Sequence, residues 1–239
     1  MPPARDELGE LAGTLNAMLG SLERAREAER RFVDDASHEL RTPLTALRGN
    51  AAYVARHGAD PGALADLEAD AARLSALLDD LLALAREDAA APVRGEPVDL
   101  ADVAREAAAT DPAAELVAGA AVMVRGERPA LDRAAVNLVR NARRHGPPGG
   151  RITVTAAREG DRATLSVADE GPGLGRDEAA HAFERFWRGT GARGEGSGLG
   201  LAIVRAIAER HGGRAAVEGS RFTIDLPAAG SQSSLQDRP

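Results

Sequence analysis

The chain contains no cysteine and no lysine, and it has few aromatic residues. The absence of cysteine excludes disulfides, thiolate nucleophiles and cysteine-ligated zinc or iron–sulfur sites. All 30 basic residues are arginine, which excludes Walker A and Schiff-base chemistry because both need a lysine amine. Aromatic residues make up 3% of the chain, so the core must be packed mainly from leucine, valine and alanine.

The sequence also lacks an excess of positive charge and a long apolar run. Its formal net charge of −7 argues against broad nucleic-acid binding. No stretch approaches about 18 consecutive apolar residues, so no transmembrane span is expected. The N-terminus does not have the charged-then-apolar pattern of a signal peptide. With 239 residues and 44% hydrophobic content, we expect one or two domains of a soluble protein from a reducing compartment.

Residues 4–30 have the pattern of an amphipathic helix that pairs with a partner helix. Apolar residues recur there at steps of three and four, at Leu8, Leu11, Leu15, Met18 and Leu22.

A second apolar stripe runs through FVDDASHELRTPLTALRG, residues 32–49, and consists of Phe32, Ala36, Leu40, Leu44 and Leu47. His38 is two residues from both Ala36 and Leu40, so it lies about 200° around the helix from either. It therefore faces away from the buried seam and is placed to react with an incoming group. The alternative is an ordinary solvated surface histidine. Pro43, about one turn after His38, removes one helical hydrogen bond and favours a bend of the helix there.

A break at residues 57–61 separates this helix from a second one. Asp60 is a plausible N-cap, and Pro61 suits the first helical position. The second helix carries its own apolar stripe, formed by Leu64, Leu67, Ala71, Leu74, Leu78, Leu81 and Ala85. An antiparallel hairpin with one exposed apolar face needs a second copy to close a four-helix bundle, so we expect a homodimer.

The pattern changes after a polar segment at residues 86–97 that contains proline and glycine. We expect helices at 101–109, 129–145, 177–182 and 199–210. We expect extended segments or strands at 98–100, 121–124, 152–156, 163–168, 214–218 and 221–226. This alternation predicts an α/β sandwich with a mixed sheet.

Two polar clusters in this half have the character of a nucleotide site. Asn137 and Asn141 are one turn apart, so their amides share a helix face, and amide oxygens are hard ligands that suit Mg²⁺. Arg144 is close to that face and is placed to meet a phosphate. Asp169 follows a strand and precedes Gly171 and Gly173, so its carboxylate is able to accept a hydrogen bond from the amino group of adenine. Taken alone, the asparagine pair is more often structural, and the Asp169 motif is equally compatible with an ordinary turn at the end of a strand.

A glycine-rich stretch, residues 194–201, leads into the last expected helix. Backbone amides at a helix N-terminus cradle phosphates, but the stretch is not a Walker loop. Glycine that allows a lid to move is an equally physical interpretation. Just before it, residues 183–188 hold three of the six aromatic residues, next to two arginines. They form either an anchor for a loop or the hinge of a lid.

In their order along the chain, these motifs resemble those of the sensor histidine kinases. SHELRTPLT is similar to the family's H box, NLVRNARRHG to its N box, DEGPG to its G1 box, FERFWRG to its F box and GSGLGLAIV to its G2 box. The resemblance covers residues 4–227. It implies a helical hairpin followed by an α/β sandwich of the GHKL (Bergerat) ATPase type. DELGELAGTLNAML also resembles the second helix of a HAMP signal-relay module.

The resemblance implies a role for each matching residue. In the hairpin, His38 would accept the γ-phosphoryl group of ATP, Glu39 would act as acid and base, and Thr42 would help to position water for dephosphorylation of the partner. Asn141 would ligate Mg²⁺, with Asn137 beside it. The other nucleotide contacts would come from Arg144, His145, Asp169, Gly171, Gly173, Gly196, Ser197, Gly198, Leu199 and Gly200. Arg144 stands where the family usually has lysine, and His145 where it usually has an aromatic residue.

The domains implied are a HAMP-like helix (1–25), a dimerisation and phosphotransfer hairpin (26–90), a linker (91–97), a catalytic ATP-binding domain (98–228) and a disordered tail (229–239). The expected cofactors are ATP and Mg²⁺, and the expected partners are a second copy of the chain and the receiver domain of a response regulator, without nucleic acid. The expected location is the cytoplasm, at the inner face of the membrane as part of a longer receptor. The alternatives are a GHKL ATPase that acts as a conformational clamp and an inactive dimeric scaffold.

Overall fold

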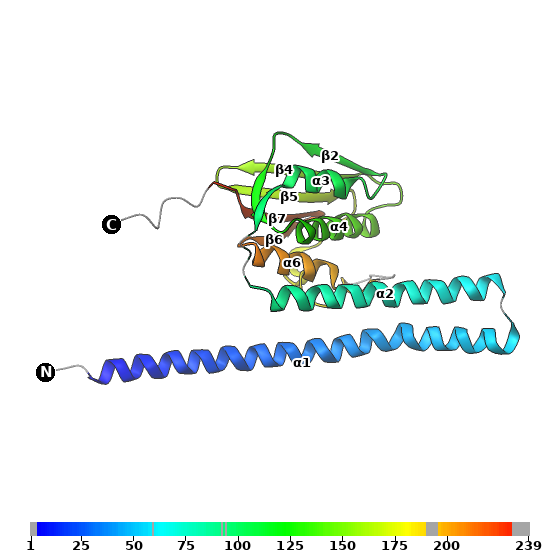
Figure 1. Cartoon of the computed structure of the whole chain (residues 1–239), viewed down its shortest axis with the longest axis horizontal. Coiled ribbons are helices and arrows are strands. Elements are labelled where there is room, and N and C mark those ends of the chain that lie inside the picture. The colour runs from blue at the N-terminus through cyan, green and yellow to red at the C-terminus, as the bar shows by residue number, and fades with distance from the viewer. Residues whose placement is uncertain (1–3, 59, 92, 94, 190–195, 231–239) are drawn as a thin grey trace. The chain divides into compact units, whose positions relative to one another are not determined.

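The computed structural model describes residues 4–58, 60–91, 93, 95–189 and 196–230 (Figure 1). These residues form two compact units, residues 1–75 and 76–239, which divide within the second helix. The sequence placed the boundary later, in the linker at 91–97. The difference arises because the last turns of this helix bond to the α/β part of the chain through Asp80, Glu87 and Asp88.

The first unit is helical. Helix α1 runs without interruption from Ala4 to His57, with Pro43 inside it. Helix α2, Pro61–Ala89, begins as predicted, since the Asp60 carboxylate accepts a hydrogen bond from the Ala63 amide at 2.9 Å. The part of α2 up to Ser75 runs antiparallel to the end of α1 (Figure 1), and Asn50 donates a hydrogen bond to the buried Asp70 at 3.0 Å.

The second unit contains a five-stranded sheet in the order β2-β4-β5-β7-β6. Its strands are β2 (Ala114–Ala118), β4 (Ile152–Glu159), β5 (Arg162–Asp169), β6 (Arg214–Glu218) and β7 (Arg221–Pro227). Only the pairing of β2 with β4 is parallel; the pairings of β4 with β5, β5 with β7 and β6 with β7 are antiparallel. A separate ribbon pairs β1 (Glu96–Asp99) with β3 (Met123–Gly126).

Three helices, α3 (Leu100–Ala108), α4 (Arg128–His145) and α6 (Gly200–Arg210), pack on one face of this sheet, and α5 (Arg176–His181) is a short connection (Figure 1). Alternate residues of β4 are buried beneath these helices. The largest fully buried side chains of the unit include Leu138 of α4, Leu165 of β5 and Ile203 of α6. The predicted α/β sandwich with a mixed sheet is confirmed.

Sequence analysis missed strand β2 and placed β3 two residues too early. Residues 114–118 read AELVA, in which Val117 is exposed and Leu116 is only half-buried. They form a strand because their backbone pairs with β4. Ala114 pairs with Ile152, which lies 38 residues later in the sequence. Local patterning carries no sign of such a pairing. Strand β1 likewise begins at Glu96, inside the predicted linker.

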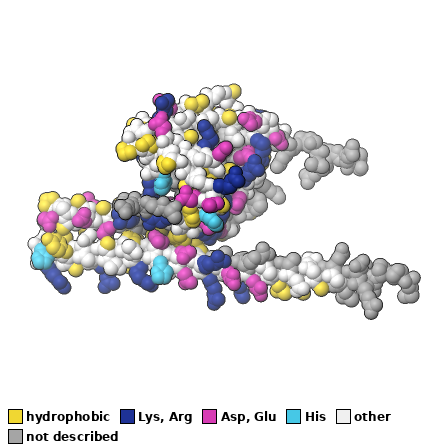
Figure 2. Space-filling view, turned by 180° about the vertical axis from the view of Figure 1, so that it is seen from behind, with side chains coloured by type: hydrophobic (Ala, Val, Ile, Leu, Met, Phe, Trp, Pro, Cys, Tyr) yellow, Lys and Arg dark blue, Asp and Glu magenta, His cyan; other side chains and the backbone are white. Residues whose placement is uncertain are grey.

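The surface of the chain shows no segregation of charge on the visible face, where acidic and arginine side chains are interspersed (Figure 2). Within the described ranges, no helix is both long enough and apolar enough to cross a membrane. The predicted tail lies outside the described residues beyond Gly230; Ala229 still donates a backbone hydrogen bond to Met123.

Candidate functional site

The reactive segment of the hairpin lies on the exposed side of α1. His38 and Thr42 are both exposed, whereas Ala36 and Leu40 are half-buried. His38 therefore faces away from the apolar seam, as the spacing predicts. Thr42 lies one turn further on, on the same face of the helix. Glu39 is half-buried beside them. This stretch can present an imidazole, a carboxylate and a hydroxyl to one incoming group.

In the second unit, α4 supplies the asparagine pair. Asn137 is buried, and its side-chain amide donates a hydrogen bond to the carbonyl of Gly200 at 3.4 Å. This bond ties the middle of α4 to the first residue of α6. Asn141 is half-buried one turn later on the same face. The two asparagines thus share the face of α4 on which Asn137 contacts Gly200.

Arg144 reaches this stretch from the last turn of α4. A Cβ atom at position 196 would lie 1.4 Å from the Arg144 Nη1 atom, so the guanidinium packs directly against Gly196. Burial, together with repulsion from Arg188 and Arg140, lowers the pKa of Arg144. These neighbours create a concentration of positive charge at the glycine-rich stretch, which favours an anion there.

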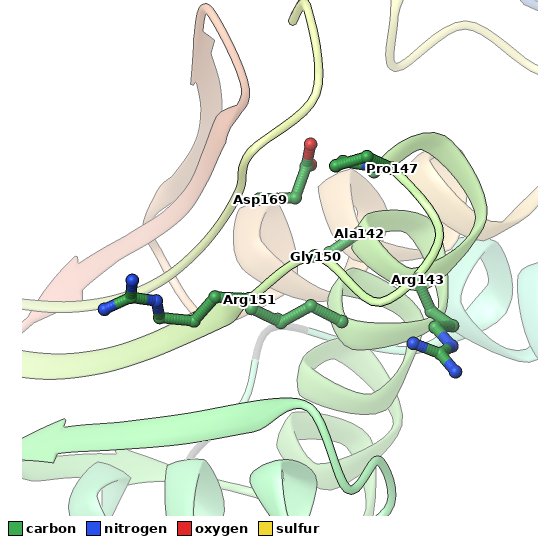
Figure 3. Close-up of a pocket in the computed structure, with 8 residues that line it drawn as sticks. Ala142, Arg143, Pro147, Gly150, Arg151 and Asp169 are labelled. Carbon is green, nitrogen blue, oxygen red and sulfur yellow. The ribbon is translucent and has the colours of Figure 1, made fainter.

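Asp169 ends strand β5, and its carboxylate is held by the turn that follows. Its Oδ1 atom accepts a hydrogen bond from the Gly171 amide at 2.7 Å. A side chain at position 171 would collide with this carboxylate and with the backbone oxygen of His145, at 2.6 and 2.8 Å. In Figure 3 the side chains of Arg143 and Arg151 extend away from Asp169. Neither of these two arginines therefore caps the Asp169 carboxylate.

The protonation of this corner is governed mainly by burial. Burial raises the pKa of Asp169, and the Gly171 amide and the nearby His145 oppose that rise. Burial also lowers the pKa of His145, and Arg144 adds to the effect. The lowered pKa of His145 favours its neutral form, and the Asp169 carboxylate, in its ionised form, accepts hydrogen bonds and so suits an amino group.

Ser220 supports Asp169 and was missed by sequence analysis. Its hydroxyl donates a hydrogen bond to the Asp169 carbonyl at 2.6 Å. The same turn packs against Gly173, whose φ is 68° and where a Cβ would lie 2.4 Å from the Gly219 carbonyl carbon. The only sequence signal was the short EGSR turn between the closing strands. Ser220 reaches Asp169 because β7, which follows Ser220, pairs with β5, which ends at Asp169.

The glycine-rich stretch is described from Gly196 onward; Gly194 and Glu195 lie outside the described residues. The Ser197 hydroxyl accepts a hydrogen bond from the Leu199 amide at 3.2 Å and donates one to Asp80 at 3.0 Å. The Phe186 amide donates to the Gly198 carbonyl at 3.0 Å. Phe186 has a φ of 60°, which is uncommon for a bulky residue and marks a constrained turn.

The aromatic segment 183–188 is held to the sheet at one end. Phe183 is buried, and its ring meets that of Phe222 edge-on at 6.3 Å. The interpretation as a hydrophobic anchor therefore holds for Phe183. Phe186, three residues later, joins the segment to Gly198, so the two sides of residues 190–195 are linked through their backbone.

The structure brings together most of the residues singled out in the second half of the sequence. Asn137 meets Gly200 at the start of α6, Arg144 packs on Gly196, and His145 and Gly171 lie next to Asp169. His38, Glu39 and Thr42 belong to the other unit. Among the described residues there is no cluster of three or more His, Asp or Glu side chains fit to bind a metal. A metal at this site would depend on amide oxygens and on oxygens of the ligand.

Two family models match the chain in this order. Residues 28–90 match the His Kinase A (phospho-acceptor) domain, and residues 126–230 match the histidine kinase-, DNA gyrase B-, and HSP90-like ATPase. The first contains His38, and the second contains all the nucleotide-site candidates from Asn137 to Gly200.

Relatives agree with these models. The signal transduction histidine-protein kinase/phosphatase MprB of Mycobacterium avium is 40% identical over an alignment of 255 positions, which covers 93% of this chain and 47% of MprB. The chain thus spans about half the length of the curated relatives it matches.

Solved structures also agree. A structure of the mycobacterial sensor histidine kinase MprB is 35% identical, with a TM-score of 0.51 over 56% of this chain and 98% of that one. The Acinetobacter baumannii histidine kinase AdeS is 25% identical, with a TM-score of 0.65 over 81% of this chain and 98% of that one. A phospho-acceptor hairpin followed by an ATPase-type sandwich, both with matching relatives, shows that this chain belongs to the sensor histidine kinases.

Proposed function

We propose that the chain transfers the γ-phosphoryl group of ATP to His38 and then to an aspartate of a response regulator. The observation that carries this proposal is the convergence of Asp169, Asn137 and Arg144 around α4, in a chain whose other unit presents His38 on an open helix face. The first group of residues suits a nucleotide, and the second suits a nucleophile.

The nucleotide contacts follow from the chemistry of each position. Asp169 accepts a hydrogen bond from the adenine amino group, since one of its oxygens already takes the Gly171 amide. Gly171 and Gly173 allow the backbone to approach Asp169 and the turn at Gly219 more closely than a side chain would permit. The amides of Gly196, Ser197, Gly198, Leu199 and Gly200 approach the phosphates at the N-terminus of α6, and Arg144 adds its charge from above Gly196. His145 flanks the base beside Asp169.

The residues present fit a Mg²⁺ ion that arrives with the nucleotide. Asn141 and Asn137 offer amide oxygens on one face of α4, and Mg²⁺ prefers a few such oxygens together with phosphate oxygens and water. Mg²⁺ bound there would neutralise charge on the phosphates.

The transfer itself needs a neutral imidazole. A ring nitrogen of His38 attacks the γ-phosphorus, a new N–P bond forms, the bond to the bridging oxygen breaks and ADP leaves. Glu39, next to His38 in sequence and half-buried, takes the proton that the imidazole loses. The protein otherwise contributes position and positive charge.

A homodimer supports this chemistry. Several large apolar side chains of the hairpin remain exposed in the single chain, including Leu44 at 45% and Leu78 at 50%. A second hairpin would cover them and complete a four-helix bundle. The exposed face below His38 is then the docking surface for the receiver domain.

We further propose that residues 26–90, 91–97 and 98–228 act as hairpin, linker and catalytic domain, preceded by a HAMP-like helix in residues 1–25. The apolar stripe of that helix is exposed, as at Leu11 and Met18, and suits a partner helix. The chain would then work in the cytoplasm, as the inner part of a longer receptor. A hydrophobic span encoded directly upstream would support this, and its absence would contradict it.

The test of the main proposal is incubation with radiolabelled ATP and Mg²⁺. We expect an acid-labile, base-stable label on the chain that falls to background in His38→Gln, while binding of an ATP analogue is retained. Equal labelling of the variant would refute the assignment. Steady ATP hydrolysis without a phosphoprotein would favour the conformational clamp, and failure to bind ATP analogues would favour the inactive scaffold.

Removal of phosphate from the regulator is a second candidate function, favoured by the position of Thr42. Its exposed hydroxyl lies one turn from His38 on the same face, where it can orient a water molecule toward a phospho-aspartate. The relative from Mycobacterium avium is named a kinase/phosphatase. We expect Thr42→Ala to slow dephosphorylation of a phosphorylated regulator and to leave labelling of His38 nearly unchanged. Equal loss of both activities would contradict this separation.

A further inference from the structure

The last turns of α2 carry three carboxylates that bond to the nucleotide-binding part of the same unit. Asp80 accepts a hydrogen bond from the Ser197 hydroxyl at 3.0 Å. Glu87 pairs with Arg210 at 2.6 Å, and Asp88 pairs with Arg185 at 2.7 Å. Asp80 and Glu87 are two helical turns apart and lie on the same face of α2, and Asp88 lies beside that face, about 100° further round than Glu87.

The contact of Asp80 differs from the other two in its target. Glu87 pairs with Arg210 at the end of α6, far along that helix from Gly200. Asp80 instead bonds to Ser197, in the stretch proposed to approach the phosphates. Ser197 in turn accepts the Leu199 amide, directly before α6 begins. A carboxylate therefore lies at the N-terminal end of α6, where a helix attracts an anion.

The surroundings of Asp80 show that its charge is partly satisfied there. Burial raises the pKa of Asp80, while the Ser197 hydroxyl and the positive charges of Arg140 and Arg133 lower it. Arg140 also repels Arg144, the residue that packs on Gly196. The positive charge of the arginines on α4 thus acts on both the Asp80 carboxylate and the proposed phosphate position.

We propose that Asp80 competes with the nucleotide and thereby lowers the affinity of the chain for ATP. Without nucleotide, its carboxylate accepts the hydrogen bond of Ser197 and holds the residues directly before α6. When ATP binds, its phosphates must either displace this carboxylate or bind beside its negative charge. This inference rests on the proposed function, because it requires nucleotide phosphates at residues 196–200. The physical reason is that two anions cannot share the same hydroxyl donor and arginine field without a repulsive free energy.

The anchor for this contact is the bond between Glu87 and Arg210. The side chains of both residues are largely buried, at 7% exposed for Arg210 and 11% for Glu87, and Arg210 also pairs with Glu127 at 2.8 Å. The Val93 amide donates to the Arg210 carbonyl at 3.2 Å, on the other side of the helix end. Loss of the Asp80 contact would therefore release Ser197 while this anchor keeps α2 in place.

The test is the affinity of the full chain for a fluorescent ATP analogue with Mg²⁺, in the natural sequence and in Asp80→Asn. Asparagine keeps the size and the hydrogen-bond acceptor but removes the charge. We expect about tenfold tighter binding, the size of effect that a hydrogen bond to a charged group has on an equilibrium. Asp79→Asn is the matched control: it removes the same charge one residue away, on an exposed side chain. We expect its affinity to change less than about twofold.

A second measurement does not depend on the nucleotide. Hydrogen–deuterium exchange of residues 196–204 in the nucleotide-free chain measures the protection of the Leu199 amide, whose hydrogen bond the Ser197 hydroxyl accepts. We expect faster exchange in Asp80→Ala than in Asp79→Ala, with unchanged helix content by circular dichroism.

The outcomes separate the inference from the proposed function. Equal, measurable affinity for the analogue in the natural chain and in Asp80→Asn would overturn the competition. Weaker binding in Asp80→Asn would show that the carboxylate supports the nucleotide and would also overturn it. If none of the variants binds the analogue, the nucleotide site itself is refuted, and the inference falls with it. Binding by Asp80→Asn alone would be its strongest support.

Discussion

The hairpin and the sandwich place their functional residues in opposite ways. In the hairpin, His38, Glu39 and Thr42 occupy a little over one turn of α1, and helical geometry alone sets the face on which each lies. In the sandwich, Asn137 contacts Gly200, 63 residues later, and Asp169 is supported by Ser220, 51 residues later. The proposed nucleophile is thus a local feature of one helix, whereas the proposed nucleotide site forms only once the sheet and its helices have packed.

The same two regions differ in how they bury apolar surface. In the sandwich, Leu138 and Ile203 are 1% and 0% exposed. In the hairpin, Leu44, Leu64, Leu78 and Leu82 are all between 43% and 50% exposed. The sandwich therefore contains its own core, while the hairpin leaves these leucines exposed in the single chain, where the proposed second copy would cover them.

The largest expected effect comes from truncating one leucine in each region, which tests whether the sandwich and the hairpin bury their apolar surface in different ways. Leu138→Ala removes a fully buried side chain and should lower the free energy of unfolding of the sandwich by about 2–5 kcal/mol. Leu78→Ala should leave the unfolding of the sandwich nearly unchanged and weaken the proposed homodimer instead. Chemical denaturation followed by circular dichroism measures the first effect, and analytical ultracentrifugation measures the second. A large loss of sandwich stability in Leu78→Ala would contradict the division.

A smaller effect should follow from Asp169→Asn. The amide can still accept a hydrogen bond from Gly171 but presents a weaker acceptor, or a donor, to the adenine amino group. We expect nucleotide affinity to fall by about tenfold to a hundredfold, the range for loss of a charge-assisted hydrogen bond. Isothermal titration with ATP and with GTP checks this. The variant should lose affinity for ATP and not for GTP, and a parallel loss for both would indicate a damaged fold.

The smallest effect should come from His211, a buried histidine at the end of α6. Its Nε2 atom accepts the Glu127 amide at 3.1 Å, and its Nδ1 atom lies 2.7 Å from the Ile207 carbonyl. Burial lowers the pKa of His211 below its ordinary value of 6.5, and the nearby Arg210 adds to this, while Ile207, Glu127 and Glu87 oppose it.

The unfolded chain therefore binds a proton more readily than the folded chain, so the stabilisation from neutral His211 is complete above pH 6.5 and is lost as the pH falls through the lowered pKa. Thermal unfolding between about pH 5 and 8 should show a falling midpoint on the acid side of the ordinary histidine range. His211→Gln should flatten this slope. His181→Gln, at an exposed site, should not, and a flattened slope there would exclude His211 as the cause.

What could be predicted from the sequence follows the same division. The start of α2, the Asp60 cap and the outward face of His38 were predicted from local rules and were confirmed, whereas α2 continues to Ala89, past the expected start of the polar segment at residue 86. The strand β2 was missed because its backbone partner lies in β4. The approach of Arg144 to Gly196 and the bonds made by Ser220 and Asp80 could not be foreseen, because each joins segments that only tertiary packing brings together. The roles of the site residues remain predictions.

The chain holds a single tryptophan, Trp187, directly after the constrained Phe186. Its amide donates to Glu184, and its neighbour Phe186 is joined to Gly198, so the indole belongs to the segment that faces residues 196–200. All intrinsic tryptophan emission of the protein therefore comes from one half-buried ring at that position. A natural optical reporter is built into the chain, and stopped-flow fluorescence of the unlabelled protein should follow events at the glycine-rich stretch in real time.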